Sequence, residues 1–340
     1  MSGVEIGFDG IGSVFSEVTH VVAGPDTRIW PYYLTVTILI AFFVYLYRRI
    51  DQPFLTWLLP KSVYFHPSHI VDLKVFCINR LFLALGLFNM VFLSAYVADS
   101  LAGGIGPMLR LDPFSPILIS LLLLAAGDFG TYWVHRIHHE NSILWPLHAL
   151  HHSAEVMTPI TVYRKHPLYD VISTFVKALL IGAVQGLFLA FFTQDPSFMT
   201  VAGVNAGYVL FNVAGSNLRH THIWLSFGPV LEHLFISPAQ HQIHHSLAPK
   251  HHNKNYGEVL AIWDWMFGTL YVPCSHETLE FGLADSAGNR LQQPHDSLAN
   301  SMFIPLRDSG LQLARLVGLR QPAQPAKAEA TRPQDTTLAE

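Results

Sequence analysis

Charged residues are scarce in this chain of 340 residues. They make up 13% of it, and 51% is hydrophobic, whereas soluble proteins are roughly a quarter charged. The mean hydropathy is +0.32. A single large soluble helical core would need apolar stripes on otherwise polar helices, but the long apolar runs here are apolar all round. The composition therefore favours a membrane protein over that alternative.

Cysteine is almost absent, with Cys77 and Cys274 as the only two. Neither belongs to a CxxC pair, and two isolated thiols make no disulfide framework. A structural zinc site of the cysteine-rich kind is therefore disfavoured. The sequence also lacks the basic segment, short apolar segment and cleavage site of a cleaved signal peptide, so we expect insertion through the membrane spans themselves.

Five apolar runs approach the length of about 18 residues that crosses a bilayer core as a helix. They are Trp30–Tyr47, Leu81–Val97, Pro116–Val134, Val171–Phe192 and Phe198–Val213. A short "TQDPS" turn joins the last two as a hairpin. The runs predict an all-α fold, a multi-span helical bundle integral to the membrane.

Basic residues fall mainly on one side of these predicted spans. That side holds Arg136, Arg164 and Lys165 after the third span and Arg219 after the fifth. The loop between the first two spans adds Arg48, Arg49, Lys61, Lys74 and Arg80. Lys and Arg accumulate in cytoplasmic loops. We therefore expect this side, which carries a histidine-rich cap, to face the cytoplasm.

The chain divides into four predicted regions. Residues 1–114 form an N-terminal membrane region with two spans, and residues 115–275 hold three spans and the histidine-rich segments. Residues 276–320 form a C-terminal extension, in which 302–319 fits either an amphipathic helix on the membrane surface or an ordinary packed helix. Residues 321–340 are rich in Pro, Ala and polar side chains, so we expect disorder.

Histidine is abundant, with 20 copies. Three boxes stand out: "HRIHH" at 135–139, "HALHH" at 148–152 and "HQIHH" at 241–245. Positions i, i+3 and i+4 lie on one face of a helix, so each box presents a cluster of imidazoles. Pro146 is expected to restart the helix before the second box, because proline is accepted in a first helical turn. The predicted hairpin returns the third box to the membrane face of the first two.

Metal binding explains this concentration of histidines best. Packed polar rings are costly unless something binds them, and neutral imidazole is the commonest metal ligand. Eight or more histidines exceed one four-coordinate site, which implies two metal ions. A lone buried histidine is more often a hydrogen-bonded core residue, and we assign the isolated ones to this class: His20, His66, His69, His233, His276 and His295.

Other metal chemistries fit less well. The hydrolytic zinc motif HExxH is absent, because "NSI" follows His139 and Glu140. Bis-histidine haem would need paired histidines inside the spans, whereas these lie at span ends. A histidine-rich membrane metal transporter or sensor is the alternative outside enzymology. It would need histidines or acids along the middle of several spans, where Asp128 is the lone deep carboxylate.

The boxes, "DFGTYWVHR" before them and "NYGEVLAIWDWMFGTLY" after them resemble the fatty acid hydroxylase/sterol desaturase superfamily over about residues 115–275. The resemblance implies a membrane-bound non-haem di-iron enzyme with two iron ions. It would use O2 and external electrons to hydroxylate or desaturate a sterol, fatty acyl or alkyl-ether lipid. It also implies a separate electron donor, ferredoxin- or cytochrome-type with its reductase, and no nucleic-acid partner.

Carried over box by box, the resemblance implies nine metal ligands: His135, His139, His148, His151, His152, His220, His241, His244 and His245. His220 comes from "LRHTHIWL", with His222 as the alternative, and the pattern leaves His138 unused. Ligating imidazoles usually donate their other N–H to a carboxylate or carbonyl. Asp128, two helical turns before His135, is the main candidate for such a partner, and His166 and Asp264 are expected near the site.

Overall fold

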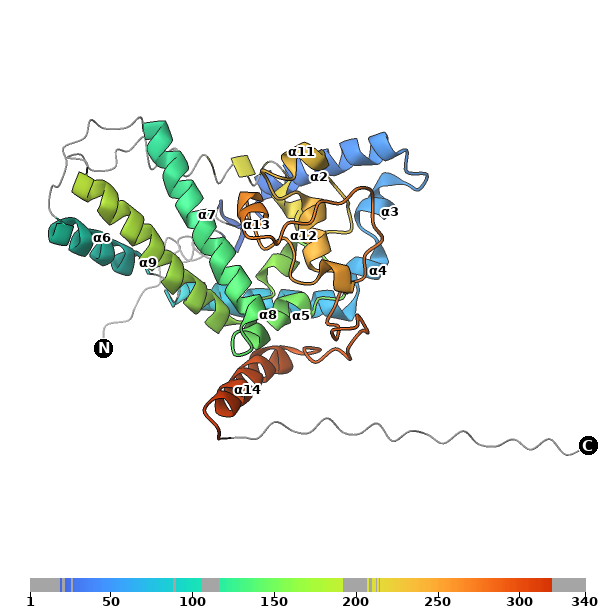
Figure 1. The fold of residues 1–340 in the computed structure, drawn as a ribbon. Coiled ribbons are helices and arrows are strands. Elements are labelled where there is room, and N and C mark those ends of the chain that lie inside the picture. Colours follow the sequence, from blue (N-terminus) through green and yellow to red (C-terminus); the bar gives the residue numbers. More distant parts are fainter. Residues whose placement is uncertain are drawn as a thin grey trace, which may run out of the picture.

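The computed structural model describes residues 27–87, 90–105, 116–191 and 215–319, with isolated positions between 19 and 25 and between 207 and 213. Within these ranges the fold is helical, with isolated β-bridges and no strand (Figure 1). The predicted all-α class is confirmed. The predicted run Phe198–Val213 falls largely outside the described residues, and the tail 321–340 falls wholly outside them.

Three helices are long and apolar enough to cross a membrane: α2 (Pro31–Arg48), α7 (Pro116–Glu140) and α9 (Pro167–Phe191). They correspond to the first, third and fourth predicted spans. Each has at least the roughly 18 residues that a membrane-spanning helix needs. Together with the apolar composition, they support an integral membrane protein.

The predicted second span, Leu81–Val97, is wrong as a single helix. The structure has α5 (Pro67–Ala84) and α6 (Val91–Ile105) instead. Gly86 lies between them with a φ of 74°, a left-handed conformation that ends a helix. Moreover, α5 buries a polar face with Ser68, His69 and Asp72. It packs against the 3-10 helix η1 (Pro159–Tyr163).

Glycines allow α6 and α9 to lie side by side, as Figure 1 shows at the end of the molecule away from α2. A Cβ atom at Gly182 would lie 2.5 Å from the Ser94 carbonyl oxygen, and one at Gly186 would lie 2.7 Å from that of Ala98. Small residues four apart are typical of close helix packing in membranes. On its other side α9 packs against α7.

Shorter helices form the part of the molecule that holds the histidine boxes. Of these, α8 (Trp145–His152) and α12 (Pro238–His244) carry the second and third boxes, and η2 (Ser216–His220) carries His220, while the first box ends the long helix α7. Pro146 stands in the first turn of α8, as predicted. The others are α3 (Phe54–Leu58), α4 (Lys61–Tyr64), α11 (Gly228–Leu231), η3 (Pro249–His251) and α13 (Ile262–Met266).

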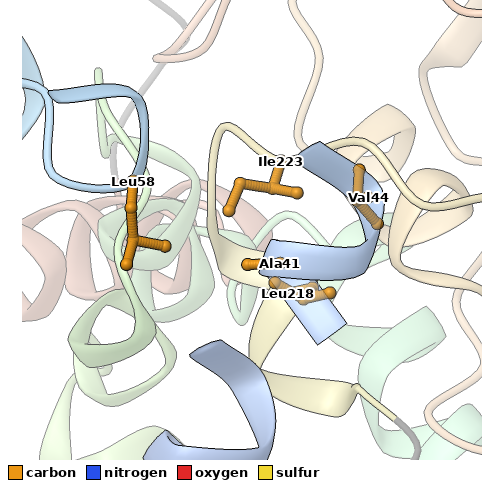
Figure 2. Packing of buried hydrophobic residues seen from close by; sticks show 5 residues of the cluster. All are labelled: Ala41, Val44, Leu58, Leu218 and Ile223. Atoms are coloured by element: carbon orange, nitrogen blue, oxygen red, sulfur yellow. The ribbon is translucent and has the colours of Figure 1, made fainter. Parts of the chain in front are cut away.

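An apolar cluster joins α2 to the segment that carries His220. It consists of Ala41, Val44, Leu58, Leu218 and Ile223, whose side chains gather between α2, α3 and η2 (Figure 2). Leu218 is completely buried. Full burial of a leucine side chain stabilises a fold by roughly 1.5–3 kcal/mol. The cluster therefore anchors η2 two residues before His220.

The helix α14 (Leu298–Leu316) follows the C-terminal extension. Ser297 caps it by accepting a hydrogen bond from the Asn300 N–H. Ser301 and Pro305 are buried, and the helix packs against α8. The packed-helix alternative therefore holds for this face, while Phe303 and Leu313 on the rest of the helix remain exposed.

Candidate metal centre

Nine histidines from four segments converge in two groups. The five-histidine group comprises His135, His139, His148, His152 and His244, and the four-histidine group comprises His151, His220, His241 and His245. In each group the nitrogen atoms that could hold a metal ion lie within 4.8 Å of one another. All of these side chains are buried except that of His139, which is partly buried. These are the nine residues that the resemblance implied as ligands, eight from the boxes and His220 from outside them.

Two main-chain carbonyl groups orient rings of the five-histidine group. His135 Nδ1 lies 2.7 Å from the Tyr256 carbonyl oxygen, and His244 Nδ1 lies 2.7 Å from that of Lys254. A carbonyl oxygen only accepts, so each Nδ1 carries the proton and each Nε2 is left with a lone pair. Both Nε2 atoms are buried with no hydrogen-bond partner.

The four-histidine group has nitrogen atoms facing one another. His220 Nε2 lies 3.3 Å from His151 Nε2 and 3.1 Å from His241 Nε2. Such a contact can hold one shared proton at most, and the Nε2 of His245 is buried without a partner. A buried polar atom without a partner is costly. Converging neutral nitrogens fit the ligand set of a metal ion that accepts imidazole.

Burial keeps these rings neutral. It lowers the pKa of His244 to about 4, although the bond to the Lys254 carbonyl acts in the opposite direction. Burial, and then neighbouring histidines or basic residues, hold the pKa well below its ordinary value in the other members outside the spans: His148, His151, His152, His220, His241 and His245. Neutral imidazole is the form that binds metal.

Two carboxylates hold the loop that supplies the Tyr256 carbonyl. Asp264 accepts hydrogen bonds from the Tyr256 and Gly257 N–H groups at 2.8 and 2.7 Å. Asp128 accepts from the N–H groups of Val259 and Leu260, both at 2.9 Å, and from the Trp263 indole at 3.0 Å. A Cβ atom at Gly257 would lie 2.7 Å from the Leu260 carbonyl oxygen, which explains the glycine.

The expectation of a direct Asp128–histidine contact is wrong. Asp128 binds backbone N–H groups instead, because seven residues of helix place it about 10 Å from His135 along the axis. Asp264 likewise reaches the histidines through the loop. His166 lies apart from both groups, since its Nε2 is 3.1 Å from the Met302 carbonyl oxygen and its Nδ1 accepts from the Leu168 N–H.

His222, His138 and His295 belong to neither group. His222 Nε2 lies 2.8 Å from the Trp57 carbonyl oxygen, so His220 is the member that joins a group. His138 Nδ1 is 2.7 Å from the Val134 carbonyl oxygen, and the His138 ring centroid is 4.4 Å from that of Tyr169. His295 is buried away from the groups, with its carbonyl oxygen accepting from Arg164.

A cavity of about 160 Å³, here termed the charged cavity, opens beside both groups. His135, His148, His151, His220 and His241 line it together with six ionisable side chains: Arg28, Lys165, Lys177, Arg219, Asp170 and Glu258. Burial and then Arg28 lower the pKa of Arg219 to about 9. Burial acts to raise the pKa of Glu258, but the surrounding cations, with Lys177 foremost, outweigh it and lower that pKa.

Apart from Asp170, which lies near the motif segments, these charged residues were not predicted from the sequence to lie at the site. Asp170 and Lys177 stand seven apart in the apolar helix α9, and so on one face of it. Ionisable residues inside a span usually face a cavity or a partner, so this pair was the available signal. Arg28 and Glu258 lie in segments without a comparable pattern.

Two further cavities adjoin the site. The apolar cavity, of about 180 Å³, is lined mainly by Leu121, Leu124, Ala125, Phe211, Phe235 and Val259, with the hydrogen-bonded Asp128 among them, and it shares Thr131 and Glu258 with the charged cavity. The far cavity, of about 200 Å³, is lined by His139, His152, His244 and His245 with Trp145 and His252. The far and charged cavities share no lining residue.

The fold and the site define a helical membrane protein with nine histidines, eight of them buried, in two potential metal-binding groups. Residues 120–269 match the model of the fatty acid hydroxylase family. An ornithine lipid hydroxylase of Rhizobium tropici is 30% identical over 225 residues, 64% of this chain and 60% of that protein. No solved structure matches the chain significantly.

Other similar proteins are named as a monooxygenase and as a desaturase. The alkylglycerol monooxygenase of Homo sapiens is 34% identical over 156 residues, 46% of this chain and 31% of that protein. A Delta(7)-sterol 5(6)-desaturase of Aspergillus fumigatus is 26% identical over 194 residues, 52% of this chain and 59% of that protein. The chain thus spans 31% to 60% of the length of these relatives. Residues 120–269 are thus similar to the fatty acid hydroxylase family, and the similar proteins are named as a lipid hydroxylase, a monooxygenase and a sterol desaturase.

Proposed function

We propose that this chain is a di-iron oxygenase that hydroxylates a membrane lipid. The observation that carries the proposal is the pair of histidine groups, whose buried nitrogens lie within 4.8 Å of one another in each group. The relatives named hydroxylase or monooxygenase share 30% and 34% identity, against 26% for the sterol desaturase. These values favour hydroxylation over desaturation.

The proposed reaction balances as RH + O2 + 2 e⁻ + 2 H⁺ → ROH + H2O. One oxygen atom enters the C–H bond and the other leaves as water. Two irons, held by the five-histidine and four-histidine groups, would supply the reductive activation of O2. A separate ferredoxin- or cytochrome-type protein would supply the electrons from outside. Desaturation would instead remove two hydrogens from the lipid and yield two waters.

The chain's own residues hold the site in the form this chemistry needs. The carbonyls of Tyr256 and Lys254 fix the tautomers of His135 and His244. Asp264 holds the Tyr256 loop, and burial excludes bulk water from the nitrogens. In this proposal residues 115–275 form the catalytic region. The excess of Lys and Arg in neighbouring loops supports a cytoplasmic position for it.

Metal analysis combined with lipid analysis tests the proposal. Purified full-length chain should contain close to two irons per molecule. Cells that make it should contain a lipid one oxygen atom heavier, and growth under isotopically labelled O2 should place the label in that lipid. A loosely held, exchangeable ion at low occupancy, with unchanged lipids, would contradict the oxygenase and favour metal transport or sensing.

A further inference from the structure

The charged cavity places ionisable side chains of a membrane helix beside the histidines. Asp170 and Lys177 belong to α9, which is otherwise apolar. An ionisable residue at such a position is costly, and it is usually retained to bind something. Within the described residues Lys177 makes no hydrogen bond or ion pair, so its ammonium group is free to bind a ligand.

Arg219 presents a second cation to the same cavity. Its side chain is only 3% exposed. One Nη donates to the Ile236 carbonyl oxygen, the guanidinium lies 4.5 Å from the Phe211 ring, and Nε is buried without a partner. No carboxylate of the described chain forms an ion pair with it. A buried guanidinium without a counter-ion is a strong receptor for an anion.

The cavity has more positive than negative groups. Four cations and two carboxylates line it, and only Arg28 and Glu258 approach within ion-pair distance, at 3.6 Å. Glu258 leaves 44% of its side-chain surface open. The balance favours an anionic ligand, and a neutral molecule such as a sterol would leave two of the four positive charges without a matching carboxylate.

The apolar cavity extends from the charged one along α7. Leu121, Leu124 and Ala125 line it, and none of its lining residues is a histidine. Thr131 and Glu258 belong to both cavities, so the two adjoin at these side chains. An amphiphile can therefore occupy both, with only its polar end beside the histidine groups.

We propose that the substrate is an acyl lipid with an anionic headgroup, whose carboxylate or phosphate binds Lys177 and Arg219 while its chain fills the apolar cavity. In this pose the carbon atoms next to the histidines belong to the headgroup or to the first carbons of the chain. Oxidation is expected there and not in the middle of the chain. The site of oxidation rests on the proposed function, whereas binding of the headgroup does not.

Matched probes test the binding step. Dodecyl phosphate, N-lauroylglycine and 1-dodecanol carry the same chain length with phosphate, carboxylate and neutral ends. Calorimetric titration of the full chain in a non-ionic detergent should show that at least one anionic probe binds more tightly than the alcohol, by a factor of about ten or more. The tighter anionic probe identifies the headgroup chemistry. Equal affinity for all three probes would overturn the proposal.

Variants of Lys177 separate this site from other sources of affinity. Lys177→Gln should weaken the anionic probes about tenfold and leave 1-dodecanol unchanged, and Lys177→Arg should restore the difference. Lys74→Gln, an exposed lysine of α5 outside the cavity, is the control and should change nothing. If a metal ion alone bound the anion, its affinity would not depend on Lys177. An unchanged difference in affinity between the anionic probes and 1-dodecanol in Lys177→Gln would therefore contradict the proposal.

The position of the inserted oxygen tests the pose. Tandem mass spectrometry of the oxidised lipid should locate the oxygen in the headgroup or in the adjoining carbons. An oxygen in the middle of the chain would overturn the pose. If the anionic probes bind as expected but no lipid is oxidised, the proposed function fails and the headgroup site stands.

Discussion

Main-chain carbonyls, and not carboxylates, orient two of the nine histidines of this site. His135 faces the Tyr256 carbonyl and His244 that of Lys254, each at 2.7 Å. A carboxylate in that place would offset part of the charge of a bound metal ion, whereas a carbonyl leaves it uncompensated. The loop at 254–257 therefore sets the tautomers of two ring nitrogens while adding no negative charge beside them.

Replacing a member of the histidine groups should remove metal. His244→Ala deletes a nitrogen that no neighbour can replace, so iron content and turnover should fall together by half or more, because metal binding depends on several imidazoles at once. His138→Ala is the matched control, since His138 lies in the first box but outside both groups. Iron content measured by mass spectrometry decides. Equal loss from both variants would mean that the first box is assigned wrongly.

Asp264→Asn should loosen the loop that carries Tyr256. The carboxylate accepts from Tyr256, Gly257 and Thr269, and an amide NH2 would face one of these donors. The expected loss is about 1–3 kcal/mol of stability, seen as a lower thermal unfolding temperature together with reduced iron. Asp51→Asn, an exposed position, serves as the control. Unchanged unfolding and iron content would show that the loop does not depend on this carboxylate.

His295 should make the fold sensitive to acid. Burial, and then Arg164, lower its pKa from 6.5 to about 4 in the folded chain. The unfolded state therefore binds the proton first, so stability is complete above pH 6.5 and declines as pH falls towards 4. His295→Gln should reduce this decline by about 1–3 kcal/mol in unfolding measured across that range, without loss of iron. An unchanged pH dependence would contradict the assignment.

Helix α7 links the membrane to the metal site within one element. Its first turns carry Leu121 and Leu124 of the apolar cavity, and its last turns carry His135 and His139. After it, Asn141 accepts hydrogen bonds from Ile143 and Leu144 and turns the chain into α8. One rigid helix thus fixes the distance between the apolar cavity and the histidines, and α9 packs against it with Asp170 and Lys177.

The contact between α6 and α9 should tolerate no side chain at Gly186. In Gly186→Leu the new Cβ atom would lie 2.7 Å from the Ala98 carbonyl oxygen. The helices must separate, at a cost of about 1–3 kcal/mol, and the thermal unfolding temperature should fall. Gly310→Leu in α14 is the matched control, because a Cβ atom there meets no atom within 4 Å. Similar unfolding temperatures for the two variants would contradict the close packing.

At the scale of the whole molecule, the sequence predicted three long apolar helices and the histidines that gather in the two groups, but it did not predict the partners of those histidines. Helical spacing in the three boxes identified eight of the nine histidines, and the resemblance added His220 as the ninth with His222 as the alternative. The choice depends on Thr221, whose extended backbone ends η2 after His220. His222 therefore contacts the Trp57 carbonyl oxygen and not the two groups. Mean hydropathy over Leu81–Val97 concealed the break at Gly86. Asp128 was misassigned because its position on the same helix face as His135 does not reveal that the segment at 259–263 packs against this face and binds the carboxylate.

The separate linings of the charged and far cavities have a kinetic consequence. A lipid in the charged cavity covers His135 and His151 but leaves the side of His139 and His244 open to the far cavity. In the proposed oxygenase reaction, O2 can therefore approach from the far cavity while the lipid occupies the charged cavity, and neither has to bind first. Initial rates measured against both concentrations should give intersecting lines, and a non-reactive lipid analogue should lower the maximal rate without competing with O2.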